Sequence, residues 1–306
     1  MRKTFIDSLT EFARKDERIM CVIGDTGFSV FEEFESEFGN RFVNVGIAEQ
    51  NFISIGAGLS AMGMKPYLYN VVSFMTLRGM EQIFLDICYQ ENPVVLVGVG
   101  GGFAYGTSGP THHALQDIAM MAGIPNMTVV CPGDPIEMKA VMDFSYEYSK
   151  PMYIRIGRNT DPIVHIEGIN LHFGKAINIT KGDSGTIFVT GVMLNTAVEV
   201  VKRLNKIDIK LSLYSVPFIK PIDEETIIKE AKNGKKLFTL EEHSVVGGLG
   251  DIVGRVLMEK CKEMPISLYK FGVPDTFADI TGNREYLDEY YGLNVDCIVE
   301  KICCLI

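Results

Sequence analysis

The stretch that decides the fold is residues 41–63, RFVNVGIAEQNFISIGAGLSAMG. Its first five residues have the pattern of a strand, Gly46 interrupts that pattern, and from Gln50 onward small and apolar residues follow at helical spacing. Glu49 is therefore predicted to lie where a strand gives way to a helix, and the helix should be buried. Its carboxylate could simply satisfy the free amides of the first helical turn, or it could serve a ligand.

The composition is typical of a folded protein with two domains. The 306 residues are 47% hydrophobic and 22% charged, with a net charge of −10 and no basic cluster, which argues against nucleic acid as a partner. The N-terminus has no signal-peptide core, and no apolar run approaches the roughly 18 residues that a membrane span needs. The seven cysteines show no metal or redox spacing, so we expect free thiols and a cytoplasmic location.

Strands and helices alternate along the chain, which predicts an α/β fold with a doubly wound, mostly parallel sheet. The predicted strand 19–23 ends in a turn that contains Asp25 and Thr26. Turns at the carboxyl ends of parallel strands build ligand clefts. Asp25 could equally serve only the amides of its own turn.

A second strand, 66–72, runs into a helical segment that carries Phe74, Arg78, Glu81 and Gln82. An aromatic face suits a flat heterocycle, because offset stacking adds to the burial of area. Phe74 could also be an ordinary core residue, with Met75 as the alternative contact.

The apolar strand 93–100 leads into a glycine-rich loop, GGGFAYGTSGPTHH, at residues 100–113. This loop does not match a P-loop, and it does not open a helix as a dinucleotide fingerprint would. Because His112 lies in a loop after a strand, we favour a functional role for it over a structural one.

The domain boundaries follow from composition. We predict a first domain at residues 1–160, a polar linker with a short hairpin at 161–183, and a second strand-helix series at 184–306. In the second domain, Glu242 and His243 are interpreted as structural.

Several motifs together resemble the transketolases and 1-deoxyxylulose-5-phosphate synthases, which use thiamine diphosphate. They are GIAEQ at 46–50, the R-x-x-E-Q run at 78–82, GPTH at 109–112 and IPNM at 124–127. The resemblance extends over nearly the whole chain. It implies a pyrimidine-binding domain followed by a transketolase C-terminal domain.

In that family, the residue that matches Glu49 hydrogen-bonds a ring nitrogen of the cofactor's aminopyrimidine and so promotes loss of the thiazolium proton. The resemblance further implies that Phe74 stacks on the aminopyrimidine. It places Asp25, Thr26 and Arg78 near the cofactor.

The resemblance also implies a substrate site. The residue that matches His112 faces the substrate and assists proton movements at the ketose oxygens. Arginines that match Arg158 and, in deoxyxylulose-phosphate synthases, Arg155 contact the substrate phosphate. Ser108 stands where transketolases have an aspartate that binds the acceptor's 2-hydroxyl, which implies relaxed selectivity there and a modified or unusual sugar.

Half of such an enzyme is missing from the sequence. The family holds Mg²⁺ and the diphosphate through a Gly-Asp-Gly motif and an asparagine about 30 residues later. None of the four Gly-Asp pairs of this chain is followed by glycine. The chain therefore resembles the C-terminal subunit of a split transketolase, a transferase acting on sugar phosphates. It is expected to pair with an N-terminal subunit that supplies the Mg²⁺ ligands, as an α2β2 heterotetramer.

Two other functions remain open from the sequence. One is the beta subunit of the decarboxylating component of a 2-oxo-acid dehydrogenase, against which GPTH and IPNM argue. The other is a non-catalytic regulatory paralogue.

Overall fold

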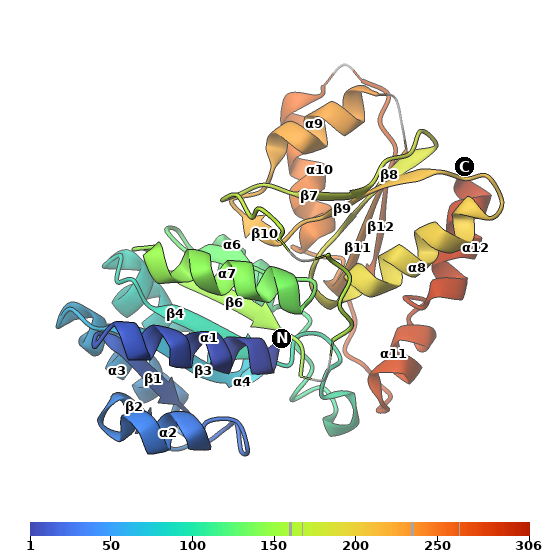
Figure 1. Ribbon diagram of the computed structural model, residues 1–306. Coiled ribbons are helices and arrows are strands. Elements are labelled where there is room, and N and C mark those ends of the chain that lie inside the picture. Colours follow the sequence, from blue (N-terminus) through green and yellow to red (C-terminus); the bar gives the residue numbers. More distant parts are fainter. Residues whose placement is uncertain (159–160, 167, 234–235, 263) are drawn as a thin grey trace.

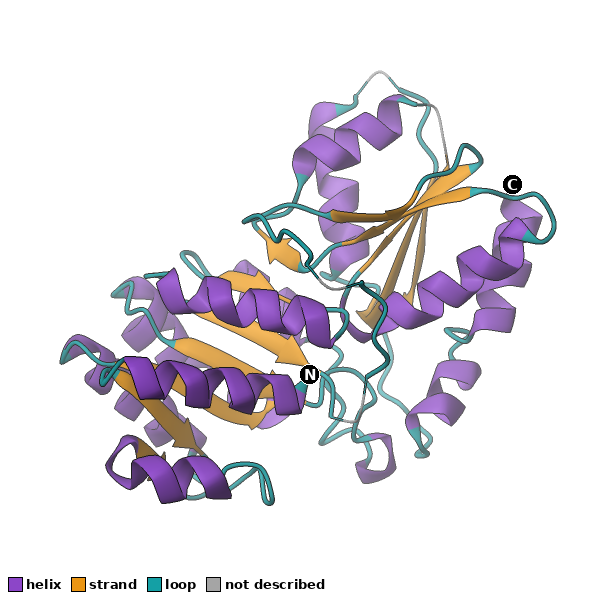
Figure 2. Ribbon diagram, viewed as in Figure 1, coloured by secondary structure: helices purple, strands orange, loops and turns teal. Residues whose placement is uncertain are grey.

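The computed structural model describes residues 1–158, 161–166, 168–233, 236–262 and 264–306. Two α/β units follow one another in the chain, with the N-terminus in the first and the C-terminus in the second (Figure 1). Each unit has a sheet between helices (Figure 2). The α/β prediction is confirmed.

The first unit takes up most of the chain's first half. Its strands are β1 (Ile19–Ile23), β2 (Phe42–Asn44), β3 (Lys65–Val71), β4 (Val95–Val99), β5 (Thr128–Val130) and β6 (Met152–Ile156). Its helices are α1 (Arg2–Lys15), α2 (Glu32–Phe38), α3 (Glu49–Ala61), α4 (Val72–Arg78), α5 (Met80–Gln82), α6 (Asp117–Gly123) and α7 (Pro135–Glu147). Short turns of other helix types are η1 (Gly39–Arg41), η3 (Gly106–Ser108) and the π-helical η2 (Ile83–Tyr89).

The second unit follows. Its strands are β7 (Ile177–Thr180), β8 (Gly185–Val189), β9 (Leu211–Ser215), β11 (Lys236–Ser244) and β12 (Leu268–Val273), while β10 (Phe218–Lys220) of the same part of the chain joins the first unit's sheet. Its helical segments are η4 (Gly191–Met193), α8 (Leu194–Asn205), α9 (Glu224–Lys232), α10 (Leu249–Lys260), α11 (Arg284–Tyr290) and α12 (Val295–Leu305).

The first sheet has the strand order β10-β5-β6-β4-β3-β1-β2. All its neighbours are parallel except β10, which pairs antiparallel with β5 and comes from the second half of the sequence. The central strands β1, β3, β4 and β6 are buried throughout, which is the pattern of a sheet covered on both faces. The mostly parallel sheet is confirmed, and β10 ties the two halves of the chain together.

The second sheet has the order β12-β11-β8-β9-β7, with only β7 antiparallel. The hairpin predicted in the linker is wrong. Strand β7 pairs with β9 rather than with a neighbour in sequence, so residues 177–180 join the second sheet. The polar composition of this stretch fits an edge strand as well as a linker.

Three apolar cores hold these layers together. One lies under α1, α2 and α7 on one face of the first sheet. The second, under α3, α4 and α6, continues into α9 and α10 of the second unit. The third lies beneath α8, α11 and α12 and includes Phe103, within the glycine-rich loop, and Leu115, just after it. This loop is thus anchored in the core of the second unit.

In the part of the chain that the structure describes, no helix is long and apolar enough to cross a membrane.

Candidate functional site

Glu49 is the first residue of α3, as the sequence predicts. Gly46, with a φ of 73°, turns the chain after β2, and Ala48 precedes the helix without offering a side-chain cap. The side chain of Glu49 is only 6% exposed. The free amides of the first helical turn and the guanidinium of Arg78, 2.7 Å from Oε1, make this burial of a carboxylate tolerable.

Arg78 extends the site from Glu49 to the aromatic residue that the sequence singled out. Its guanidinium carbon lies 4.3 Å from the centre of the Phe74 ring, one helical turn earlier in α4. The ring of Phe74 in turn meets His112 edge to face, with centroids 4.9 Å apart. The structure therefore brings Glu49, Arg78, Phe74 and His112 into one continuous set of contacts.

His112 is held by the base of its own loop. A β-bridge between Gly102 and Ala114 closes the loop, and the hydroxyl of Ser73 donates to the carbonyl of Thr111 over 3.3 Å. The Oγ1 of Thr111 lies 2.9 Å from Nδ1 of His112. Burial, together with the nearby His113 and Arg78, lowers the pKa of His112, so its ring is neutral at neutral pH.

His113 faces the other way. It is buried, and its Nε2 contacts the carbonyl oxygen of Gly106 at 3.1 Å.

Ser108 ends the short turn η3, and its side chain is exposed. Its backbone amide donates to the carbonyl of Tyr105 over 2.9 Å, which fixes the serine relative to that tyrosine.

Asp25 and Thr26 form the turn after β1. Asp25 is exposed, with a φ of 54°, and its amide donates to Oδ1 of Asn44 over 3.1 Å. The same oxygen accepts from the amide of Gly46, so this turn is tied to the chain that leads into α3. The hydroxyl of Thr26 is buried without a hydrogen-bond partner among the described residues.

The structure separates the two arginines that were expected to bind phosphate. Arg158 is exposed beyond the end of β6, with its guanidinium carbon 4.4 Å from the centre of the Tyr105 ring. Arg155 is not brought to this site. It is buried, its Nε pairs with Asp117 at 2.8 Å, and its Nη2 donates to the carbonyls of Ala114 and Glu242.

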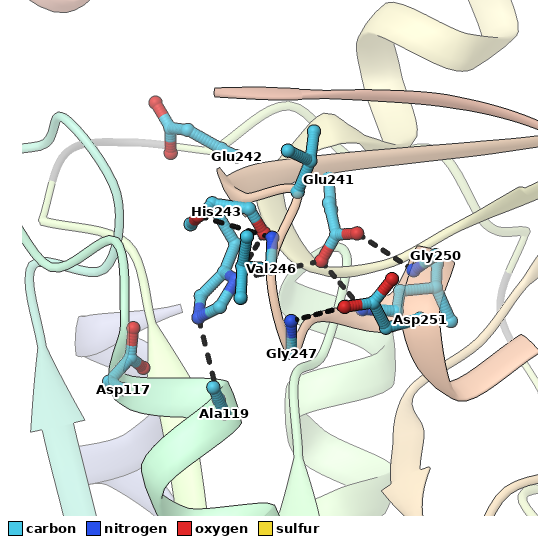
Figure 3. A network of polar contacts seen from close by, with 12 residues as sticks. Asp117, Ala119, Glu241, Glu242, His243, Val246, Gly247, Gly250 and Asp251 are labelled. Atoms are coloured by element: carbon cyan, nitrogen blue, oxygen red, sulfur yellow. Dashed lines mark hydrogen bonds and ion pairs between the residues drawn. The ribbon is translucent and has the colours of Figure 1, made fainter. Parts of the chain in front are cut away.

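Arg155 instead contacts Asp117 and the carbonyl of Glu242, two residues of a polar network between the two units (Figure 3). There, the carboxylate of Glu241 accepts from the amides of Leu249 and Gly250 at the start of α10, and burial raises its pKa to about 7. His243 contacts the amide of Ala119 on α6 from the other side of the junction. Glu242 and His243 are buried in this junction, which fits the structural role expected for them.

Two residues of the site escaped the sequence analysis. Tyr105 lies between Arg158 and His112, with its ring centroid 5.9 Å from that of the histidine. Arg2 and Arg158 line a groove of about 940 Å³ beside the start of α1. The signal for Tyr105 was its position as one of two aromatic residues in a glycine-rich loop. Arg2 had no signal beyond its charge.

Comparison with known proteins agrees with this arrangement. The family model "Transketolase, pyrimidine binding domain" matches residues 1–162, and "Transketolase, C-terminal domain" matches residues 174–298. The chain belongs to the transketolase family, whose members depend on thiamine diphosphate, and it carries the pyrimidine-binding half of such a transferase.

Two relatives align over almost their whole length. The chain is 36% identical to one of the subunits of an apulose-4-phosphate transketolase from Phocaeicola vulgatus, covering 97% of this chain and 94% of that one. It is 34% identical to the 6-deoxy-6-sulfo-D-fructose transketolase subunit SqwH of a Clostridium species, covering 98% and 92%. The alternative as a 2-oxo-acid dehydrogenase component is not favoured by these similarities.

Among solved structures, a protein described as a split gene transketolase, inactive beta4 tetramer, is similar with a TM-score of 0.87. It is 33% identical, and the alignment covers 98% of this chain and 95% of that one. A transketolase of Pichia stipitis, 19% identical with a TM-score of 0.81, shares the fold over 99% of this chain and 45% of its own.

Proposed function

We propose that this chain binds the aminopyrimidine of thiamine diphosphate and becomes an active transketolase only with a second, diphosphate-binding chain. The observation that carries the proposal is the contact series from the buried Glu49 through Arg78 and Phe74 to His112. A buried carboxylate and an aromatic face suit an aminopyrimidine, which has both a basic ring nitrogen and a flat surface. Thr26, whose buried hydroxyl has no partner among the described residues, offers a further polar contact.

Glu49, Phe74 and His112 have separate roles in the proposed reaction. When bound, thiamine diphosphate supplies the nucleophilic carbon for transfer of a two-carbon ketol unit. Glu49 holds a proton at the pyrimidine nitrogen, and Phe74 fixes the plane of the ring. The neutral His112, oriented by Thr111 through Nδ1, exchanges a proton with a substrate hydroxyl through Nε2.

The anionic end of the sugar is assigned to Arg158 and Arg2. Guanidinium groups match the oxygen geometry of phosphate. Neither arginine forms an ion pair with a carboxylate among the residues that the structure describes, so both charges are open to a ligand. Asp25 and Arg78 complete the cofactor side.

The relatives favour a modified sugar as substrate. Their names give apulose 4-phosphate and 6-deoxy-6-sulfo-D-fructose, both of which carry an anionic group. Ser108 has a short, uncharged and exposed side chain, so it places no fixed charge near the acceptor. We assign to this chain a sugar with a terminal oxyanion and an unusual hydroxyl pattern.

The metal and the diphosphate are assigned to the partner. No group of three or more His, Cys, Asp or Glu side chains that could hold a metal ion occurs among the described residues. A partner with Gly-Asp-Gly and a later asparagine would supply oxygen ligands to Mg²⁺. The expected assembly is α2β2, because each site needs both chains and such oligomers are symmetric. The seven free cysteines suit a reducing compartment such as the cytoplasm.

Titration calorimetry tests the split site. We expect weak binding of thiamine diphosphate with Mg²⁺ to this chain alone, and tight, Mg²⁺-dependent binding when the partner is added. Ketol transfer should appear only in the mixture. Tight, Mg²⁺-dependent binding by the isolated chain would contradict the division of the site between two chains.

A further inference from the structure

Resting on the proposed function, we propose that Tyr105 determines substrate specificity by joining the reacting end of the site to its anion-binding end. The side chain lies between His112 and Arg158 and contacts both. It would line the middle of a short sugar chain and bind the terminal oxyanion, a phosphate or a sulfonate, together with Arg158 and Arg2.

The ring position is set by the backbone. A Cβ atom added at Gly100 would come within 2.1 Å of Cε2 of Tyr105, so the ring packs directly on the Gly100 backbone. Gly100 also has a φ of 87°, which disfavours any side chain there. The absence of a side chain at Gly100 is thus what makes room for Tyr105.

The main chain couples the same tyrosine to Ser108. The carbonyl oxygen of Tyr105 accepts the amide hydrogen of Ser108, and the tyrosine precedes the turn η3 that contains the serine. Three groups assigned to the substrate, namely His112, Ser108 and Arg158, are therefore each in contact with Tyr105. A change at Tyr105 would reach all three of them.

The hydroxyl lies in a positive environment. Burial raises the pKa of Tyr105, so the hydroxyl stays protonated at neutral pH, while the charges of Arg158 and Arg2 act on it in the opposite direction. A phenol hydrogen and two guanidinium groups are all donors, and a terminal phosphate or sulfonate offers three acceptor oxygens.

The ring and the hydroxyl make separate contributions. The ring holds the guanidinium of Arg158 by a cation–π contact and presents an apolar surface to the sugar. The hydroxyl would donate to the oxyanion. Because the ring fills the space between His112 and Arg158, it also limits the length and branching of the acceptor.

Three variants in the reconstituted complex separate these roles. Tyr105→Phe removes only the hydroxyl, Tyr105→Ala removes the ring as well, and Tyr269→Phe in β12 of the second unit is the matched control. Each is assayed with pairs of acceptor aldehydes that differ only in the terminal group: phosphate, sulfonate or hydroxyl.

For Tyr105→Phe we expect KM to rise roughly tenfold or more for anionic acceptors, since a hydrogen bond to a charged group is lost. The kcat value and the KM for the uncharged acceptor should change much less than the KM for anionic acceptors, because the ring and its contacts remain. Tyr105→Ala should raise the KM for anionic acceptors further and should reduce the preference for short acceptors over longer ones. If KM rises equally for the sulfonate and the phosphate acceptor, the site recognises either oxyanion. If KM rises for only one of them, that terminal group is the one that Tyr105 recognises.

A binding measurement keeps this test independent of turnover. Calorimetric titration of the wild-type complex with inorganic phosphate and with sulfate should show weak binding that Tyr105→Phe reduces and Tyr269→Phe leaves intact. Equal effects on anionic and uncharged acceptors, or unchanged anion binding in Tyr105→Phe, would overturn the role of Tyr105. If the wild-type complex binds phosphate or sulfate but shows no ketol transfer at all, this result would instead count against the proposed function.

Discussion

Glu49 and Arg78 show how a single ion pair can prepare a site before the ligand arrives. The carboxylate of Glu49 is almost fully buried, whereas the side chain of Arg78 is half exposed. The glutamate is therefore fixed by its surroundings, and the arginine is freer to move. An isolated buried carboxylate would be costly, and the guanidinium offsets that cost. The arginine can move when a pyrimidine nitrogen competes for the carboxyl group, because about half of its side chain is in solvent.

The first prediction concerns this carboxyl group. Glu49→Gln should preserve folding and assembly, because the amide has the same shape, but it cannot share a proton with the pyrimidine nitrogen. Hydrogen–deuterium exchange at the thiazolium carbon in the reconstituted complex should fall by roughly 10²- to 10⁴-fold. Glu81→Gln, at an exposed position in α5, is the control and should exchange at the wild-type rate. Exchange at the wild-type rate in the Glu49 variant would remove Glu49 from the proton transfer.

A second prediction at the residue scale concerns Ser108. An aspartate there would add a carboxylate that accepts a hydrogen bond from the acceptor's 2-hydroxyl and is left unpaired when that hydroxyl is absent. Ser108→Asp should therefore increase the ratio of kcat/KM between acceptors with and without the 2-hydroxyl. The measurement uses both acceptors with wild type and variant. A wild-type enzyme that already discriminates as strongly as the variant would show that Ser108 is not the determinant.

The sequence predicted where Glu49 and His112 lie in the fold, at the start of a helix and in a loop after a strand, because these positions follow from local sequence patterns. It could not predict positions that depend on contacts with distant residues. Arg155 and Arg158 look alike in sequence, three residues apart at the end of one strand. Only the structure shows that Arg155 is buried in an ion pair with Asp117, which is distant in sequence, whereas Arg158 is exposed.

At the scale of elements, the buried parallel strands were the most predictable. Strand β1 has the bounds that its apolar run indicated, because a strand buried on both faces needs a continuous apolar sequence. Strand β10 lies in the predicted second domain by sequence, yet it pairs with β5 of the first sheet. Its pairing with β5 depends on how the two units dock, which no local pattern records.

Helix α3 offers a paired test of packing within one element. A Cβ at Gly56 would come within 2.6 Å of the side chain of Leu68 on β3, whereas a Cβ at Gly58 would meet nothing within 4 Å. Gly58→Ala should stabilise the isolated chain by up to about 1 kcal/mol, through better helix propensity. Gly56→Ala should destabilise it by about 1–3 kcal/mol, through overpacking.

Chemical denaturation of the isolated chain measures both changes. The two variants carry the same substitution in the same helix, so each serves as the control for the other. Equal effects on the free energy of unfolding would mean that α3 does not pack against β3 as closely as the structure indicates.

At the scale of the whole molecule, the second unit supports the loop that carries the candidate substrate residues. Phe103 stacks on Tyr291 with centroids 5.3 Å apart, and a Cβ at Gly106 would come within 2.5 Å of the carbonyl oxygen of Gly282. Glu242 packs against Gly102 at the base of the loop. The position of His112 therefore depends on a domain that holds none of the candidate cofactor residues.

The last prediction concerns the ionisable groups at this junction. Arg284 contacts Glu242 at 2.8 Å and Asp288 at 3.5 Å. Burial and the neighbouring carboxylate of Glu242 raise the pKa of Asp288 to about 8, with Glu285 acting in the same direction and Arg284 opposing it. Asp288 thus keeps a proton in the folded chain between roughly pH 4 and pH 8, where an unfolded aspartate has lost it.

Because the native state binds the extra proton, the contribution of Asp288 to stability is greatest at low pH and is lost as the pH rises through that window, by at most about 1.4 kcal/mol per pH unit. Asp288→Asn has no such proton to lose. The melting temperature of wild type relative to Asp288→Asn should therefore fall between pH 5 and pH 8.5, measured by thermal unfolding of both proteins in the same buffers. Asp296→Asn, which alters an exposed ion pair with Arg203, is the control and should show no comparable trend. A constant difference between wild type and Asp288→Asn across this range would show that Asp288 is ionised in the folded chain and that the junction holds no extra proton there.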